Sequence, residues 1–167
     1  MRTRIRFPNV VAIVSGLVMT AAMRLPWWIL TFEWTGTSYI YPYLISGPAS
    51  EVVGYKRSAQ MQILTYLLVA CIILSFLGSA LRGWKGRLVL GAAGALALLA
   101  VWRFVARITS VASGFSMPIQ GHGMAYYSGF EVMPVSARLG VGLYLMVAGA
   151  VLCLLASLLH NWLRPCR

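Results

Sequence analysis

Acidic side chains are almost missing from this chain of 167 residues. Glu33, Glu51 and Glu131 are the only three, against 14 lysines and arginines. Most catalysis, and most proton or cation transport, needs carboxylates or other titratable groups at the working site. No acid lies inside a long apolar stretch, so the sequence argues against an enzyme, a proton relay and a cation-coupled carrier.

Cysteine and histidine are also scarce. Cys71 and Cys153 lie within apolar stretches and Cys166 is near the end of the chain, so the segments expected outside the membrane offer no disulfide. A Cys-x-x-Cys motif, typical of thiol oxidoreductases, is absent. His122 and His160 are expected on opposite sides of the membrane, which argues against a histidine pair holding a haem within the bundle. We therefore predict no cofactor bound by this chain alone.

Apolar residues dominate the sequence, since the chain is 60% hydrophobic and has a mean hydropathy of +0.79. A membrane-spanning helix needs about 20 apolar residues. Four segments fit, and they predict an all-α membrane protein with a four-helix transmembrane bundle: residues 8–30, 60–81, 88–110 and 137–160. The first segment, with its basic start, also fits a cleaved signal peptide, but we favour a retained span.

The connecting segments are predicted to be an outer loop (31–58), a cytoplasmic turn (82–87), a second outer loop (111–136) and a cytoplasmic tail (161–167). The first outer loop is rich in aromatic and β-branched residues, which predicts two or three short strands in a small extracellular layer. An irregular aromatic loop lying on the membrane is the alternative. Glycine and proline break the second outer loop, so we expect it to drape over the first without a long element.

Basic residues set the predicted orientation. With both termini in the cytoplasm, eight of them fall on short cytoplasmic segments: Arg2, Arg4, Arg6, Arg82, Lys85, Arg87, Arg164 and Arg167. Such an excess on short inner segments is the usual orientation signal of membrane proteins. We therefore expect a multi-pass protein of the cell membrane, whose positive charge faces anionic lipid and not nucleic acid.

All three acids fall in outer loops, near several arginines. Charges in a partly buried layer need partners, and we predict ion pairs between two groups of side chains, the acids Glu33, Glu51 and Glu131 and the arginines Arg103, Arg107 and Arg138. Solvated loop charge is an equal alternative. For Arg103 and Arg107, which are four residues apart on one helix face, reaching the lipid headgroups is the other explanation.

Small residues and tryptophans suggest how the helices sit in lipid. Pairs of small residues four apart let helices approach closely, and three such pairs are Ser75 with Ser79, Gly91 with Ala95, and Gly149 with Cys153. Tryptophan collects at the membrane boundary, which predicts four interface anchors, Trp27, Trp28, Trp102 and Trp162. Whether the small-residue faces pack within one chain or against a partner stays open.

One metal site is conceivable in the second outer loop. His122, Met124 and Met117 combine an imidazole with soft thioethers, a ligand set that suits copper(I). Ordinary packing of methionine in an apolar chain is the alternative.

The predicted layout resembles the claudin-like tetraspan membrane proteins. The fourth span is the closest local match, because Leu139, Gly140, Val141, Gly142, Leu143 and Tyr144 are similar to the glycine-rich last helix of that group. Claudins also carry a Trp, Gly-Leu-Trp and two-cysteine signature in the first outer loop. Here Trp34 is followed by Thr35 and Gly36, and that loop has no cysteine. The resemblance therefore implies a topology and no functional residue.

Three function classes follow. The first, which we favour, is a non-enzymatic structural or accessory subunit that contacts other membrane proteins or copies of itself. The second is a subunit of a membrane redox complex that helps to enclose a quinone, haem or copper site. The third is a channel or carrier.

Overall fold

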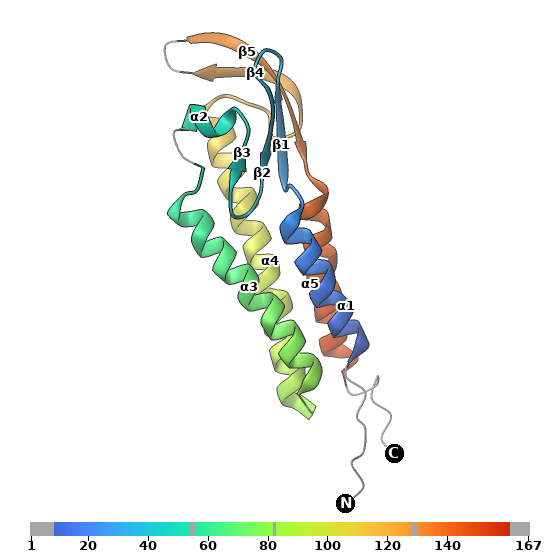
Figure 1. Ribbon diagram of the computed structural model, residues 1–167. Coiled ribbons are helices and arrows are strands. Elements are labelled where there is room, and N and C mark those ends of the chain that lie inside the picture. The colour runs from blue at the N-terminus through green and yellow to red at the C-terminus, as the bar shows by residue number, and fades with distance from the viewer. Residues whose placement is uncertain (1–8, 54–55, 82, 128–129, 161–167) are drawn as a thin grey trace, which may run out of the picture.

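The structure is a computed structural model that describes residues 9–53, 56–81, 83–127 and 130–160. Within these ranges the chain forms five helices and five strands, arranged as a long helix bundle with a β-sheet at one end (Figure 1). The helices are α1 (Val10–Arg24), α2 (Ala49–Val53), α3 (Ala59–Ala80), α4 (Gly83–Gly114) and α5 (Val141–Leu158). The strands are β1 (Trp28–Phe32), β2 (Gly36–Ile40), β3 (Ile45–Ser46), β4 (Gly121–Tyr127) and β5 (Phe130–Leu139).

Four helices make the bundle. Helix α1 packs against α3 and α5, and α4 packs against α3 and α5, so the order around the bundle is α1, α3, α4, α5. By length and composition α3, α4 and α5 are apolar enough to cross a membrane, whereas α1 is apolar but shorter. The chain is therefore a membrane protein. We call the end of the bundle that carries the sheet the sheet end, and the opposite one the far end.

Helix α4 is much longer than the span predicted at 88–110. With 32 residues it measures about 48 Å at 1.5 Å per residue, against about 30 Å for a bilayer core. Its first turns take up most of the turn predicted at 82–87. Its last turns run past the tops of the other helices and lie beneath the sheet, where Phe104, Ile108 and Ala112 are buried (Figure 1).

The sheet is antiparallel, with the strand order β3-β2-β1-β5-β4. The first outer loop, predicted to form two or three short strands, contains β2, β3 and the end of β1, whereas most of β1 lies in the segment predicted as the first span. The second loop, predicted to lack a long element, supplies the other two, and β5 with its 10 residues is the longest of all. Pro134 does not interrupt β5, because it lies opposite Glu33, one residue beyond the end of β1, and its carbonyl accepts the Glu33 N–H at 3.3 Å.

The two faces of the sheet differ. Trp28, Leu30, Val135 and Ala137 point to a buried inner face, while Thr31 and Tyr39 lie on an exposed face. A sheet with open edges leaves backbone groups that hydrocarbon cannot satisfy. The sheet therefore lies beyond the membrane-spanning part of the bundle.

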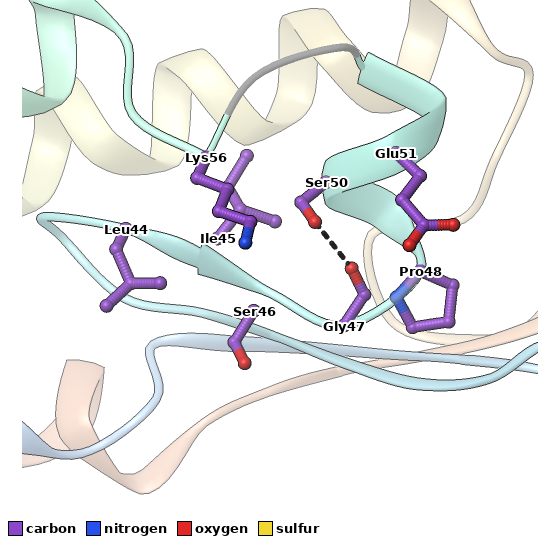
Figure 2. A pocket seen from close by; sticks show the side chains of 8 residues that line it. All are labelled: Leu44, Ile45, Ser46, Gly47, Pro48, Ser50, Glu51 and Lys56. Carbon is purple, nitrogen blue, oxygen red and sulfur yellow. Dashed lines mark hydrogen bonds between the residues drawn. The ribbon is translucent and has the colours of Figure 1, made fainter.

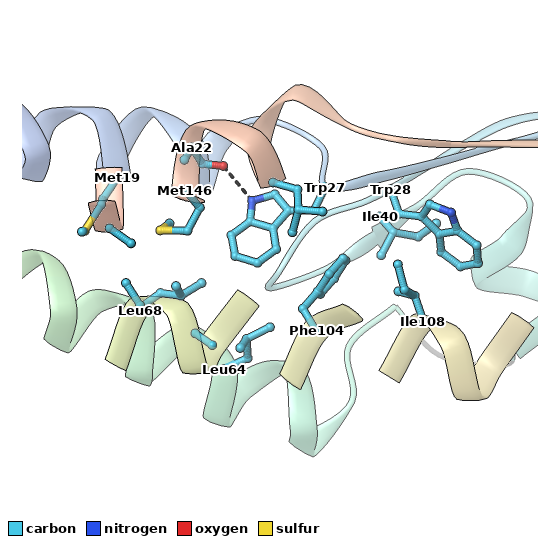
Figure 3. Close-up of a cluster of buried hydrophobic side chains, with 14 of the residues drawn as sticks. Met19, Ala22, Trp27, Trp28, Ile40, Leu64, Leu68, Phe104, Ile108 and Met146 are labelled. Atoms are coloured by element: carbon cyan, nitrogen blue, oxygen red, sulfur yellow. Dashed lines mark hydrogen bonds between the residues drawn. The ribbon is translucent and has the colours of Figure 1, made fainter. Parts of the chain in front are cut away.

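Trp27 joins the sheet to the bundle (Figure 3). Its indole N–H donates to the Ala22 carbonyl at 2.9 Å, and its ring packs edge-on against Phe104 with centroids 5.0 Å apart. Its backbone N–H donates to Ile40, and its carbonyl accepts from Gly140 at 2.8 Å. One residue thus contacts α1, α4, β2 and the start of α5.

This junction changes the predicted ends of the first and fourth spans. Helix α1 ends at Arg24 and strand β1 begins at Trp28, so the segment 8–30 is not one helix. Likewise β5 continues to Leu139, before α5 starts at Val141. Trp27 and Trp28 are 0% and 3% exposed, so they are core residues and not the predicted lipid-facing anchors. The reason is that the chain turns into β1 immediately after α1 and brings both rings under the sheet.

Gly142 tests this junction. A Cβ atom there would lie 2.5 Å from the Leu25 carbonyl oxygen and 2.6 Å from Trp27 Cδ1. We expect Gly142→Ala to lower the free energy of unfolding by about 1–3 kcal/mol, because a packed site must shift. Thermal unfolding in mild detergent measures this.

Gly114→Ala is the matched control, since a Cβ atom there meets nothing within 4 Å. It should stay within about 0.5 kcal/mol of the native protein. Equal stability of the two variants would contradict the close contact at Gly142.

Candidate functional site

One edge of the sheet is formed by a strand that has a single neighbouring strand among the described residues. Strand β4 lies at this edge, paired only with β5 among the described residues. Pro134 of β5 lies opposite Met124 of β4. The Pro134 carbonyl points to the β1 side of β5, where it accepts from Glu33, so Met124 and Pro134 form a non-hydrogen-bonded pair between β4 and β5. Met124, and by the same alternation His122, direct their backbone groups away from the sheet. An open edge of this kind can pair with a strand of another chain.

Side chains around this edge are exposed and partly apolar. Met124 is 48% and Tyr126 is 55% exposed. The adjoining exposed face of the sheet carries a polar row, in which Thr31 and Thr37 lie within hydrogen-bonding distance, with 3.2 Å between their hydroxyl oxygens. Tyr126 already uses its backbone N–H in a bond to the Phe115 carbonyl. The free length of the edge is therefore centred on His122 and Met124.

The three predicted copper ligands are not brought together. His122 and Met124 are two residues apart on β4 and so share its exposed face. A Cβ atom on Gly123, between them, would meet Pro118 on the other face at 2.8 Å. Met117, which precedes Pro118, packs against the hydrophobic core. The sheet thus separates Met117 from the other two, and the described residues contain no cluster of three or more His, Cys, Asp or Glu side chains that could hold a metal.

The predicted ion pairs are not formed among the described residues. Glu33 lies just beyond β1 and Glu51 lies in α2, and both are exposed. Arg103, Arg107 and Arg138 are exposed as well, and none of these side chains forms an ion pair within the described part of the chain. The side chain of Glu131 lies outside the described residues. Exposure of these side chains fits the two alternatives to ion pairing, which are solvated loop charge and, for Arg103 and Arg107, contact with the lipid headgroups.

The predicted small-residue pairs are only partly at helix contacts. Ser75, Gly149 and Cys153 are buried between helices, and Gly149 lies against Met19 of α1. Ser79 is also buried. Ala95, in contrast, is exposed on α4.

Gly91 is partly buried and faces α5, where a Cβ atom would lie 3.3 Å from Ser157 Oγ. Three further small residues of α4 meet other helices, and the pairwise spacing did not reveal them. Ala93, Gly94 and Ala97 are buried there. A Cβ atom on Gly94 would lie 2.9 Å from the Ala150 carbonyl.

A buried polar network closes the far end of the bundle. Asn9 caps α1 by accepting the Ala12 N–H on Oδ1 at 3.3 Å. This places its amide nitrogen 3.2 Å from both the Ala156 carbonyl and His160 Nδ1. His160 Nδ1 therefore accepts, and its Nε2 donates to the Leu81 carbonyl at 3.1 Å. Both ring nitrogens of His160 are engaged, so it is not a free ligand.

His160 is 0% exposed, so it belongs to the packed far end of the bundle. Sequence reasoning missed this network. The available signal was Asn9 directly before an apolar run, the usual position of a helix cap.

Serine and cysteine side chains continue this polar contact into the bundle. Ser15 donates to Gly149 O at 2.8 Å and Ser75 donates to Ala12 O at 2.9 Å. Cys153 donates to Leu90 O at 3.4 Å, and Ser157 donates to Arg87 O at 2.7 Å. Each bond joins two helices. Together they tie the four helices by polar contacts that need no water.

A shallow pocket of about 410 Å³ lies between β3 and α2 (Figure 2). Glu51 and Lys56 are its charged side chains, and the Ser50 hydroxyl donates to the Gly47 carbonyl at 2.8 Å. Among its described lining residues, neither Ser46 nor Ser50 is hydrogen-bonded to Glu51 or Lys56.

Trp102 and Trp162 are the other two predicted tryptophan anchors. Trp102 lies on α4 and is 61% exposed, as a lipid-facing ring should be. Trp162 lies outside the described residues.

Comparison with models of known protein families finds none that matches this chain, and comparison with curated proteins finds no match. The function therefore has to be argued from the geometry above.

Asn9→Ser tests the far-end network. A serine hydroxyl can still cap α1, but both donations from the amide nitrogen are lost. Loss of the bonds from this nitrogen to the Ala156 carbonyl and to His160 Nδ1 should lower the unfolding free energy by about 1–3 kcal/mol. Unfolding in detergent measures the loss. Gln62→Ala, which removes an exposed amide from α3, is the control and should have little effect. Equal effects of both changes would argue against the network.

Proposed function

We propose that this protein is a non-enzymatic, four-span membrane protein that acts as a structural or accessory subunit. Its bundle crosses the bilayer, and its sheet contacts another membrane protein or a second copy of the chain. The observation that carries the proposal is the open β4 edge above a closed bundle.

The contacts of α1 support a fourth crossing. At the far end Asn9 meets His160, which follows α5. At the sheet end the Pro26 carbonyl accepts from Gly142, in the first turn of α5. Helix α1 with its flanking residues therefore runs between the same two levels as α5, whose 18 residues cover about 27 Å at 1.5 Å per residue. If α5 crosses the membrane core, α1 crosses it as well.

The far end is the better candidate for the cytoplasmic side. Lys85 and Arg87 are exposed at the start of α4, at that end, and the positive-inside rule favours such residues in the cytoplasm. Both termini then face the cytoplasm of a cell membrane, and the sheet lies outside.

Cysteine labelling tests this arrangement. Thr35→Cys places a thiol in the exposed turn between β1 and β2, and Lys85→Cys places one at the far end. In intact cells a membrane-impermeant maleimide should label position 35 fully and position 85 only after permeabilisation. The opposite pattern would reverse the orientation. Equal labelling of both positions in intact cells would overturn the four-span proposal.

A through-path for ions or solutes is not supported. The middle of the bundle is filled by side chains that are 0% exposed, among them Leu68, Leu90, Ala97 and Met146. Its polar groups are small and bonded to backbone carbonyls of neighbouring helices. A redox role is likewise weakened, because both ring nitrogens of His160 are engaged.

The layout also supports the claudin-like resemblance as a proposal about fold. Strands from both loops join in one sheet over four apolar helices. The first-loop signature of claudins is missing, so we extend the proposal to no claudin function.

Photo-crosslinking tests the edge. Benzoylphenylalanine in place of Met124 should give a protein adduct of one discrete mass in native membranes, because a partner strand would lie beside it. The same group at Thr35, exposed in the outer layer but off the edge, should give several-fold less. Mass spectrometry then distinguishes a second copy from a different subunit.

A second variant carries Met124→Pro together with benzoylphenylalanine at position 122, and it tests whether a partner strand pairs with the backbone of this edge. The proline acts on the backbone of β4. It removes an N–H that points away from β5, so it spares the β4–β5 ladder. It should reduce the adduct from benzoylphenylalanine at His122 several-fold. If positions 122 and 124 give no adduct, or the same adducts as position 35, the edge is not the contact surface.

A further inference from the structure

One arginine on or beside each of the four bundle helices lies near the level at which α1, α3 and α5 end below the sheet. Arg24 is the last residue of α1, Arg57 precedes the cap of α3, Arg103 lies on α4 and Arg138 lies two residues before the cap of α5. All four side chains are exposed. We call these four residues the arginine girdle.

The girdle lies at one level of the bundle. Helices α1, α3 and α5 have their sheet ends at a similar height in Figure 1. Arg24, Arg57 and Arg138 lie at or within three residues of these ends in the sequence. Helix α4 continues past this height, and its Phe104 packs against Trp27, which lies between α1 and β1. Arg103, next to Phe104, is therefore close to the same level.

The girdle also surrounds the bundle, because the four helices form a ring and each contributes one arginine. Within the described part of the chain no carboxylate forms an ion pair with any of the four. Four like charges are thus held around one perimeter with no acidic partner from the described residues.

The side chains below the girdle are those of a lipid-facing surface. Ile63 and Tyr66 of α3, Trp102 of α4 and Tyr144 of α5 are all more than half exposed. The sheet above cannot lie in hydrocarbon. The girdle therefore coincides with the boundary between hydrocarbon and headgroups.

The chemistry of this boundary favours phosphate. Arginine binds phosphate with two parallel hydrogen bonds and is always charged. Helices α3 and α5 also direct their N-terminal, positive dipole ends to this level.

From this arrangement we propose that the arginine girdle binds the phosphates of anionic lipid headgroups in the leaflet at the sheet end. The inference rests on the membrane-spanning part of the proposed function, and it is independent of the protein partner and of which side the sheet faces. In this proposal the bound headgroups fix the depth of the bundle in the membrane.

Site-resolved lipid labelling tests the girdle. The full chain is reconstituted with phosphatidylglycerol, or with phosphate-free digalactosyldiacylglycerol, each carrying a diazirine near the headgroup end of one acyl chain. Labelling of the peptide that contains Trp102 reports the sheet end, and labelling of the peptide with Trp84 reports the far end, where that ring is also exposed. We expect labelling at Trp102 to favour phosphatidylglycerol roughly fivefold.

Charge removal should abolish that preference at one end only. Combining Arg24→Gln, Arg57→Gln, Arg103→Gln and Arg138→Gln should make the two lipids label the Trp102 peptide equally, with labelling at Trp84 unchanged. The matched control, Lys85→Gln with Arg87→Gln, should leave labelling at Trp102 unchanged. Unchanged labelling at Trp84 also shows that the variant remains folded and inserted.

Two results would overturn the proposal. One is equal labelling of the native Trp102 peptide by both lipids. The other is a phosphatidylglycerol preference that survives in the four-glutamine variant. Millimolar inorganic phosphate should not displace phosphatidylglycerol, and displacement would identify a site for soluble phosphate and not for lipid. Cysteine labelling at positions 35 and 85 reports the crossing by α3 independently of lipid binding, so failure of the girdle and failure of the proposed membrane arrangement can be told apart.

Discussion

The buried ring of Trp27 is the contact on which the architecture depends. A membrane helix bundle and a water-exposed sheet obey different rules, because lipid demands that each helix satisfy its own backbone while a sheet must pair between strands. Trp27 lies where the two meet, and its backbone bonds to both β2 and the start of α5. Its indole N–H bonds to α1 and its ring rests on α4. The sheet is therefore held at a defined position on the bundle.

Below this junction the helices are held by close approach and by small polar bonds. Lipid tails provide no hydrophobic drive for helix association, so packing and interhelical hydrogen bonds must supply it. Gly94 and Gly149 permit the approach, and Ser15 and Ser75 supply bonds across it. Among the described residues, the middle of the bundle is filled by side chains that are 0% exposed, such as Leu68 and Met146. The contacts proposed above, with a partner chain and with lipid, therefore lie on the surface, at the β4 edge and at the arginine girdle.

Sequence patterns predicted the local features well and the long-range ones poorly. Long apolar segments predicted α3, α4 and α5, and β-branched and aromatic residues predicted strands in the first outer loop. The same reasoning missed β4 and β5, because their glycines and proline look like loop residues until a partner strand is known. Pro134 fits within β5 because β1 ends at Phe32, which pairs with Val135, so the position opposite Pro134 lies beyond the end of β1. Trp27 and Trp28 look like surface anchors until the chain is seen to fold back beneath the sheet.

The sequence by itself determined the membrane environment, the approximate positions of the apolar helices and the poverty of catalytic groups, because these depend on composition and on local runs of residues. Tertiary structure alone decided which residues meet. It put His160 beside Asn9, separated Met117 from His122 and Met124, and set β5 against β1. The physical reason is that such contacts join residues far apart in the chain, and whether they form depends on the register and packing of whole elements, which no local pattern encodes.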